Sequence, residues 1–252
     1  MRHEHQFKGR QFPVPALVLA IALSCIFGTA LAQDKAQTNI KPGEAQASST
    51  STAVENIGLA RQLAAYGQEQ ESPLALLAAA QIQLENPSMV ITREKEEMAF
   101  EGEQAAGEGT KSAAVAPGLE PSELVAEAER MAGGDREVLA LCRELSGRME
   151  VDEGTKGRVG GAANHRDQVS SRSKDIYQIS FRGGELASVF IMGDGDTDLD
   201  LFIYDENGNL IGSDVDATDV CLVQWTPRWT GMFRVEIHNL GNVYNVYVLT
   251  TN

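Results

Sequence analysis

The chain has 252 residues, which is enough for one or two domains. Its 36 Asp and Glu outnumber 21 Lys and Arg, for a formal charge of −15, which disfavours nucleic acid and anionic membrane surfaces as partners because each needs a basic face. Hydrophobic residues make up 42% of the chain, below the globular norm, so part of it is expected to form no core.

The N-terminus has the pattern of a secretory signal peptide. Three basic residues precede an uncharged run over residues 12–32, which ends in Ala30-Leu31-Ala32. We expect cleavage before Gln33, and hence a periplasmic or extracellular protein without a membrane contact after cleavage. An uncleaved anchor is the alternative, because the run is nearly long enough to span a bilayer. The mature chain would carry 18 Lys and Arg against 35 Asp and Glu, a formal charge of −17.

The region after the signal peptide is predicted to hold a disordered leader and two helical hairpins. Residues 33–53 are rich in Gln, Ala, Ser and Thr, which predicts the leader. Helical spacing then follows within residues 54–147, interrupted by a loose acidic insertion over residues 92–118. The spaced positions are Val54, Ile57, Ala60, Leu63, Ala64, Leu74, Leu77, Ala78 and Ile82, then Leu124, Val125, Ala128, Met131, Val138, Leu139, Cys142 and Leu145. The hairpins either pack as a small bundle or stay marginal until something binds them.

The last third of the chain reads as strands. Residues 148–173 are polar and predict a linker or an irregular first strand, and after residue 174 the apolar period falls to two. Seven runs follow with turn signals between them: 177–181, 186–192, 199–204, 210–212, 220–225, 232–238 and 243–249. Residues 174–252 therefore predict an antiparallel β-sandwich, which makes the chain an α+β multidomain protein.

A dense acidic stretch lies between the second and third of these runs and extends into the third, at Asp194, Asp196, Asp198 and Asp200. Unpaired carboxylates so close together repel one another, and calcium would suit them because it takes six to eight oxygen ligands. The match to an EF-hand loop fails, since Leu199 stands where that loop needs Gly. The stretch is either a tentative calcium site or a solvated acidic loop.

Two aromatic residues follow the acidic stretch on the strand face that should not be buried. Strand alternation places Leu199, Leu201 and Ile203 on the buried side, and Phe202 and Tyr204 on the opposite side. The rings are then either covered by another part of the chain, such as the helices or the polar segment before the strands, or exposed as a partner-binding surface.

The segments "DIYQISF", "GDTDLDLFIYDENGNLI", "WTPRWTGMFRVEIHN" and "YNVYVLTTN" of residues 175–252 resemble the bacterial pre-peptidase C-terminal domain. The resemblance implies a jelly-roll-like sandwich with a non-catalytic role in export, maturation or surface binding. Some relatives of this family bind calcium, which the resemblance extends to this chain only as an expectation. No peptidase motif accompanies these segments.

The mature chain offers few groups for catalysis. Its two histidines are His165, in the polar linker, and His238, on the expected outer face of a strand, and no zinc, nucleophile-elbow or phosphate-loop motif is present. Cys142 and Cys221 lie on apolar faces, which favours buried free thiols over a disulfide. We therefore expect no enzyme, and no cofactor apart from tentative calcium. The expected function is an exported binding or accessory protein with an unknown exported protein or envelope component as partner. The alternative is an enzyme subunit or a hydrolase that uses unrecognised carboxylates.

Overall fold

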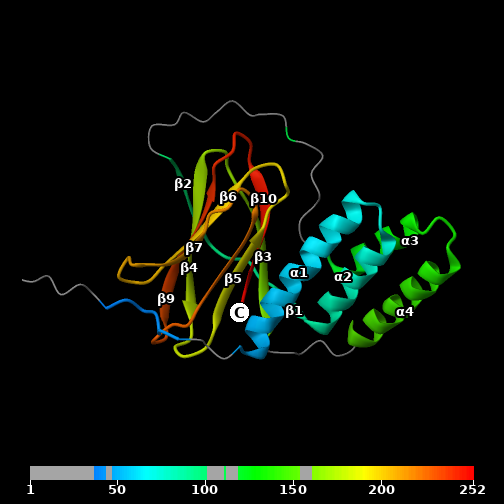
Figure 1. Ribbon diagram of the computed structural model, residues 1–252, viewed down its shortest axis with the longest axis horizontal. Helices are drawn as coiled ribbons and strands as arrows, with labels where there is room; N and C mark the ends of the chain where they lie inside the picture. Colours follow the sequence, from blue (N-terminus) through cyan, green and yellow to red (C-terminus); the bar gives the residue numbers. More distant parts are fainter. Residues whose placement is uncertain (1–36, 44–46, 101–110, 112–118, 154–160) are drawn as a thin grey trace, which may run out of the picture. The chain divides into compact units, whose positions relative to one another are not determined.

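The computed structural model describes residues 37–43, 47–100, 111, 119–153 and 161–252 (Figure 1). Residues Ala36–Asn252 form one compact unit, and the predicted signal peptide lies outside the described residues. None of the helices in the described ranges is both long and apolar enough to cross a membrane.

Four helices confirm the two predicted hairpins. They are α1 (Ser49–Glu69), α2 (Pro73–Glu85), α3 (Pro121–Met131) and α4 (Arg136–Glu153). Asp135 caps α4 as its sequence position predicts, because its carboxylate accepts from the backbone N–H groups of Glu137 and Val138 at 2.9 and 3.3 Å. The helices share one apolar core, so the two hairpins pack together as a small bundle.

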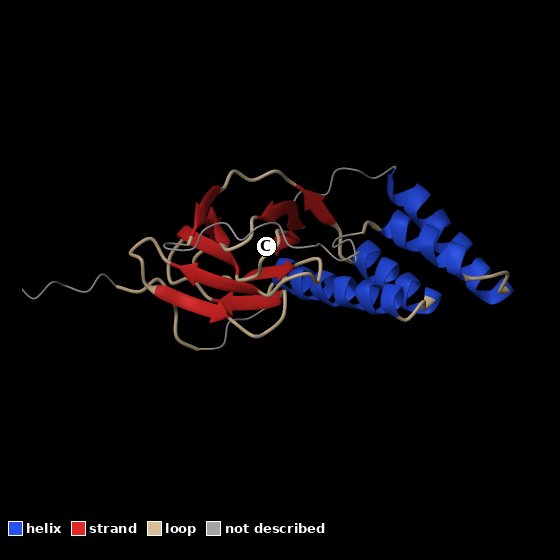
Figure 2. Ribbon diagram, turned by 90° about the horizontal axis from the view of Figure 1, so that it is seen from above, coloured by secondary structure: helices blue, strands red, loops and turns tan. Residues whose placement is uncertain are grey.

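In the described part of the chain, ten strands form two sheets packed face to face, which confirms the β-sandwich (Figure 2). Sheet A has the order β1 (Ser88–Val90), β3 (Ala162–Val169), β10 (Asn245–Thr251), β5 (Ala187–Met192) and β8 (Val220–Trp225). Sheet B has the order β2 (Glu96–Ala99), β4 (Ser173–Phe181), β9 (Gly231–Asn239), β6 (Leu199–Tyr204) and β7 (Leu210–Asp214). All neighbours are antiparallel except β1 and β3.

The sandwich core lies between the sheets, and strand β5 shows how it meets the helices. Val189 and Ile191 point into the sandwich core, whereas Phe190 and Met192 pack on the other face of the sheet with residues of α1, so every residue of β5 is buried. Gly58 of α1 permits this contact, because a Cβ there would lie 2.9 Å from the Phe190 ring. Helix α1 therefore belongs to the helical core on one side and covers sheet A on the other.

Two strands lie in segments where the sequence indicated a loose insertion, for β2, and a linker or an irregular first strand, for β3. Strand β2 lies at the start of residues 92–118, and β3 is a regular strand of eight residues beside β10. Neither has a clear apolar alternation: β2 is exposed throughout, and β3 buries polar residues such as Asn164 and His165. Apart from Lys111, residues 101–118 lie outside the described part of the chain.

The leader predicted over residues 33–53 also differs from expectation. Helix α1 begins at Ser49, and residues 37–43 lie against the sandwich, where Asn39 is fully buried and Ile40 packs on the core. Low hydrophobicity indicated disorder here, but hydrogen bonds rather than apolar contacts fix Asn39.

Candidate functional site

Asp194 and Asp196, two of the four tentative calcium ligands, contact the ammonium group of Lys111. The Lys111 Nζ lies 2.5 Å from Asp194 Oδ2 and 2.9 Å from Asp196 Oδ2. It also donates to the carbonyl oxygen of Tyr244 at 3.2 Å and lies 4.1 Å from the centre of the Tyr244 ring. Burial lowers the pKa of Lys111, but the two carboxylates outweigh it and raise the pKa above its ordinary value. Lys111 therefore stays protonated in this position.

Asp198 and Asp200, the other two tentative ligands, have different neighbours. Burial and the charge of Asp216 raise the pKa of Asp198 above its ordinary value. Burial also raises the pKa of Asp200, as do the charges of Asp198, Asp214 and Asp216. Among the described residues neither carboxylate has a cationic partner, so this group carries mutual repulsion.

The four predicted ligands thus fall into two groups. Within the described part of the chain, no set of three or more His, Cys, Asp or Glu side chains is placed to hold a metal ion. Calcium at Asp194 and Asp196 would have to displace the Lys111 ammonium, and calcium binding stays a prediction.

Phe202 and Tyr204 lie on the outer face of sheet B, and both side chains are half-buried. The Phe202 ring lies 4.7 Å from the ring of His238, and Phe100 packs on the same histidine at 5.3 Å. The guanidinium of Arg234 lies 4.5 Å from the centre of the Tyr204 ring. Among the described residues, the rings are therefore flanked by His238 and Arg234 of β9 and by Phe100, which follows β2.

A buried carboxylate lies in the middle of this outer face. Glu236 is 4% exposed and contacts Lys174 at 2.8 Å, Arg234 at 2.9 Å and His238 at 2.9 Å. Burial raises the pKa of Glu236, but the hydrogen bonds from Lys174 and His238 outweigh it and lower the pKa below its ordinary value. Burial lowers the pKa of His238 despite the contact with Glu236, which opposes it. We define the sheet B face as Lys174, Ile176, Phe202, Tyr204, Arg234, Glu236 and His238.

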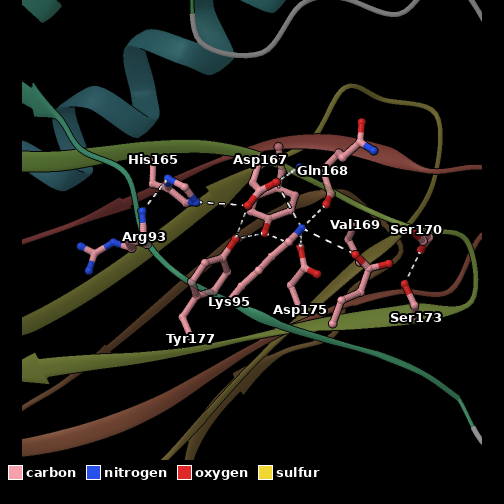
Figure 3. A network of polar contacts seen from close by, with 12 residues as sticks. Arg93, Lys95, His165, Asp167, Gln168, Val169, Ser170, Ser173, Asp175 and Tyr177 are labelled. Atoms are coloured by element: carbon pink, nitrogen blue, oxygen red, sulfur yellow. Dashed lines mark hydrogen bonds and ion pairs between the residues drawn. The ribbon is translucent and has the colours of Figure 1, made fainter.

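A second polar cluster joins the two sheets and was not predicted (Figure 3). Lys95 Nζ lies 2.9 Å from Asp175 Oδ2 and 3.1 Å from Asp167 Oδ1. Asp175 also accepts from the Tyr247 hydroxyl at 2.6 Å. The Tyr177 hydroxyl donates to Asp167 Oδ2 at 3.2 Å and contacts the Tyr247 hydroxyl. Asp167 of β3 and Tyr247 of β10 belong to sheet A, and Asp175 and Tyr177 of β4 belong to sheet B. The cluster, which we call the Lys95 cluster, therefore links the two sheets to each other and to the segment before β2.

The sequence indicates one member of this cluster, Asp175, but not its partner Lys95. Asp175 stands two residues before Tyr177, so strand alternation puts its carboxylate on the buried face, where it needs a partner. Burial raises the pKa of Asp175, although the hydrogen bonds from Tyr247 and Lys95 oppose this. The partner Lys95 is 80 residues away in the chain, and no local pattern assigns it.

His165 belongs to the same cluster and corrects an expectation. It was predicted to lie in a flexible linker, but it is 4% exposed within β3 and its Nε2 lies 3.3 Å from Asp167 Oδ2. Its Nδ1 accepts from the backbone N–H of Arg93 at 3.3 Å. The ring is held at both nitrogens, by Asp167 of β3 and by the backbone of the segment between β1 and β2.

The described residues line cavities at two places away from these polar clusters. One of about 290 Å³ lies at the ends of β4 and β5, and the other, of about 440 Å³, lies between α1 and β8. The larger cavity is lined by Glu55 and Asp214, but Glu55 accepts from Gln224 at 2.7 Å and Asp214 from the N–H of Leu222 at 2.9 Å. Neither cavity is lined by the Lys95 cluster or the sheet B face.

Both described cysteines are buried free thiols, as their apolar positions predicted. Burial raises the pKa of Cys142 and of Cys221 above the ordinary thiol value, so both stay protonated. Neither is suited to act as a nucleophile.

No family model and no curated protein matches this chain. Among solved structures, the Yersinia pseudotuberculosis-derived mitogen is 11% identical, with 37% of this chain and 86% of that chain covered and a TM-score of 0.31. PliG of Aeromonas hydrophila, a periplasmic inhibitor of g-type lysozyme, is 10% identical, with 36% and 84% covered and a TM-score of 0.28. The pre-peptidase C-terminal domain of a Bacillus anthracis collagenase is 11% identical, with 37% and 81% covered and a TM-score of 0.22. TM-scores this low carry no argument about function.

Proposed function

We propose that this chain is an exported, non-catalytic binding protein whose β-sandwich recognises a protein partner through the sheet B face. The observation that carries the proposal is a difference between the two sheets. Helix α1 covers the outer face of sheet A, whereas the described helices make at most marginal contact with sheet B. The outer face of sheet B carries two half-buried aromatic rings and an arginine, the residue types that dominate the energetics of protein interfaces.

The rigidity of this face supports the same function. Glu236 is held by three cationic or imidazole groups, and Phe202 and Tyr204 each rest against one of those groups. Side chains already fixed in one arrangement lose less conformational entropy when a partner binds. The rings of Phe202 and Tyr204 can therefore contact a partner without first being reordered.

Export is the second part of the proposal, and it is tested by the mature N-terminus. Cleavage after Ala32 predicts that exported material begins at Gln33, which mass spectrometry of the purified protein would show. A mature chain that begins at Cys25 and carries lipid would contradict this.

Site-specific crosslinking tests the binding face. A photo-reactive phenylalanine analogue in place of Phe202 is expected to give discrete protein adducts in the native envelope. The matched control is the same analogue at Tyr66, which is 56% exposed on α1. Equal adducts from both positions, or none from position 202, would argue against the sheet B face.

A further inference from the structure

Lys95 holds its amine against two carboxylates within the Lys95 cluster (Figure 3). Its Nζ lies 2.9 Å from Asp175 Oδ2 and 3.1 Å from Asp167 Oδ1, and it donates to the carbonyl oxygen of Gln168 at 2.5 Å. Glu97 is more distant, at 3.8 Å. The Asp175 side chain has no exposed surface, and that of Lys95 is only 17% exposed. The amine and the Asp175 carboxyl are therefore held in contact and largely shielded from water.

The surroundings of the Asp175 carboxyl favour its neutral form. Its Oδ2 accepts from Lys95 and from Tyr247, whereas its Oδ1 is buried and has no hydrogen-bond partner among the described residues. A buried charged oxygen without a partner is costly, and an amide oxygen in the same place costs less. Burial raises the pKa of Asp175, although the hydrogen bonds from Tyr247 and Lys95 oppose this. The raised pKa favours the carboxylic acid, which is the form that an amine attacks.

A chain of hydroxyl groups connects Asp167 with Asp175. The Tyr177 hydroxyl donates to Asp167 Oδ2 at 3.2 Å and contacts the Tyr247 hydroxyl. The Tyr247 hydroxyl in turn donates to Asp175 Oδ2 at 2.6 Å. Once Asp167 carries a proton, it can donate to Tyr177 and each hydroxyl can donate to the next oxygen, so that a proton reaches Asp175 Oδ2. Because Asp167 also contacts Lys95 Nζ, the cluster has a proton acceptor at the amine and a proton donor at the carboxyl.

We propose that Lys95 and Asp175 condense into an intramolecular isopeptide bond, with Asp167 as the catalytic base. One ammonium proton passes to Asp175 Oδ2, and the free amine attacks the carboxyl carbon. Asp167 then takes a second proton from the nitrogen, and the hydroxyl chain delivers it to Oδ2, which leaves as water when its bond to carbon breaks. The ion pair contains all the atoms of the amide and of the water, so the step needs no co-reactant.

The ion pair between Lys95 and Asp175 is the state of the chain before this reaction. Burial lowers the pKa of Lys95, but the hydrogen bonds to Asp175 and Asp167 outweigh it and raise the pKa above its ordinary value. The free amine is therefore the minor form, and the reaction is slow. Proximity offsets this, because groups held in contact react as if they were at a very high concentration.

The bond fastens an exposed edge of sheet B. Lys95 precedes β2, an edge strand that is exposed throughout, and Asp175 lies on the neighbouring strand β4. The two residues are 80 positions apart, and a covalent link across such a loop stabilises a fold by constraining the unfolded chain. Exported proteins commonly use disulfides for this purpose, but both described cysteines are free thiols. The bond acts inside the sandwich, and this inference stands whether or not the sheet B face binds a partner.

Tryptic peptide mapping of the natural mature chain tests the inference. The folded protein is incubated so that a slow reaction can finish, and it is then unfolded, digested and measured by mass spectrometry. Trypsin cuts after Lys and Arg but not after a modified Lys95, so we expect residues 94–111 joined to residues 175–182. The joined peptide should weigh one water less than the sum of its two parts.

Lys95→Arg is the matched control, because a guanidinium keeps the positive charge beside Asp175 but stays protonated and cannot replace the amine. It should give residues 175–182 only as a free peptide. Asp167→Asn, with its fold checked by circular dichroism, should lower the yield of joined peptide about tenfold or more at equal incubation times. Recovery of residues 96–111 and 175–182 only as free peptides from the folded natural chain would overturn the inference. An undiminished yield in folded Asp167→Asn would overturn the catalytic role of Asp167.

Discussion

The backbone N–H of Asn39 donates to Asp205 Oδ2 at 2.9 Å. This bond joins residues 37–43, which we call the N-terminal arm, to the turn after β6. Asn39 is fully buried, and its Oδ1 accepts from the backbone N–H groups of Arg228 and Trp229 at 2.9 and 3.1 Å. One side chain therefore satisfies two loop donors that have no strand partner. The arm is a structural part of the sandwich.

Asn39→Ala is expected to lower the free energy of unfolding by about 1–3 kcal/mol, because it leaves two partly buried backbone N–H groups without their acceptor. Urea unfolding measures this. The control is Asn207→Ala, an exposed residue of the same turn, which is expected to change stability by less than about 0.5 kcal/mol. Equal effects of the two substitutions would mean that the arm contributes nothing specific.

The sequence predicted most elements that have an apolar period. The four described helices and strands β4–β10 were found from apolar spacing and turn signals, and burial of one face repeats most clearly in β6, at Leu199, Leu201 and Ile203. Strands β1 and β2 were not found, since both are short. Strand β3 was predicted only as the alternative to a linker, since it buries His165 and Asn164 through hydrogen bonds and has no apolar period.

The candidate sites were less accessible to sequence reasoning because their partners are remote. The outward position of Phe202 and Tyr204 follows from strand alternation, and the structure agrees. The pairing of Lys111 with Asp194 joins residues 83 positions apart, and no periodicity reports such a contact. The acidic stretch alone therefore suggested a metal where the structure places a lysine.

The contribution of Asp198 and Asp200 to the free energy of unfolding should change with pH in the opposite direction to that of Asp205. The folded-state pKa values of Asp198 and Asp200 are raised above 3.8, so their contribution to stability is present below that pH and is lost as pH rises. The double substitution Asp198→Asn/Asp200→Asn should therefore raise the free energy of unfolding at neutral pH. This gain should disappear as the pH falls toward 3.8.

Asp205→Asn is the matched comparison. Burial raises the pKa of Asp205, but hydrogen bonds from Asn209, Asn39 and Asn207 outweigh it and lower the pKa below 3.8. Its stabilisation is present above that value and is lost as pH falls, so Asp205→Asn should destabilise the protein at neutral pH. Urea unfolding across acidic to neutral pH compares the variants, and a pH dependence of the same sign for both would refute the assignment.

Lys95→Met is expected to lower the free energy of unfolding by about 3–5 kcal/mol, because it leaves the fully buried Asp175 without its cation. Adding Asp175→Asn should restore part of the loss by removing the uncompensated charge. Lys41→Met, at an exposed lysine, is the control and should have little effect. A loss in Lys95→Met no larger than in Lys41→Met would show that the cluster does not hold the sheets together.

Arg61 of α1 offers a test in the stabilising direction. It is 4% exposed, its Nε and Nη1 have no hydrogen-bond partner among the described residues, and burial lowers its pKa to about 10. Arg61→Met is expected to raise the free energy of unfolding by about 1–3 kcal/mol, because it removes buried donors that are not satisfied. Thermal unfolding measures this change. Arg130→Met, at a side chain that is 71% exposed, is the control and should leave the stability unchanged. A destabilised Arg61→Met would mean that the guanidinium has a stabilising role.

The double substitution Phe202→Ser/Tyr204→Ser tests the sheet B face most directly, by quantitative capture of envelope proteins on the immobilised mature chain. The matched control is Leu59→Ser/Tyr66→Ser, two side chains of α1 that are each 56% exposed. We predict that the sheet B variant loses only about 1–2 kcal/mol of stability, because its rings make stacking and cation–π contacts rather than filling the core, and that it loses its captured partner. The control should keep that partner. Undiminished capture by a folded Phe202→Ser/Tyr204→Ser variant would contradict the proposed binding function of this face.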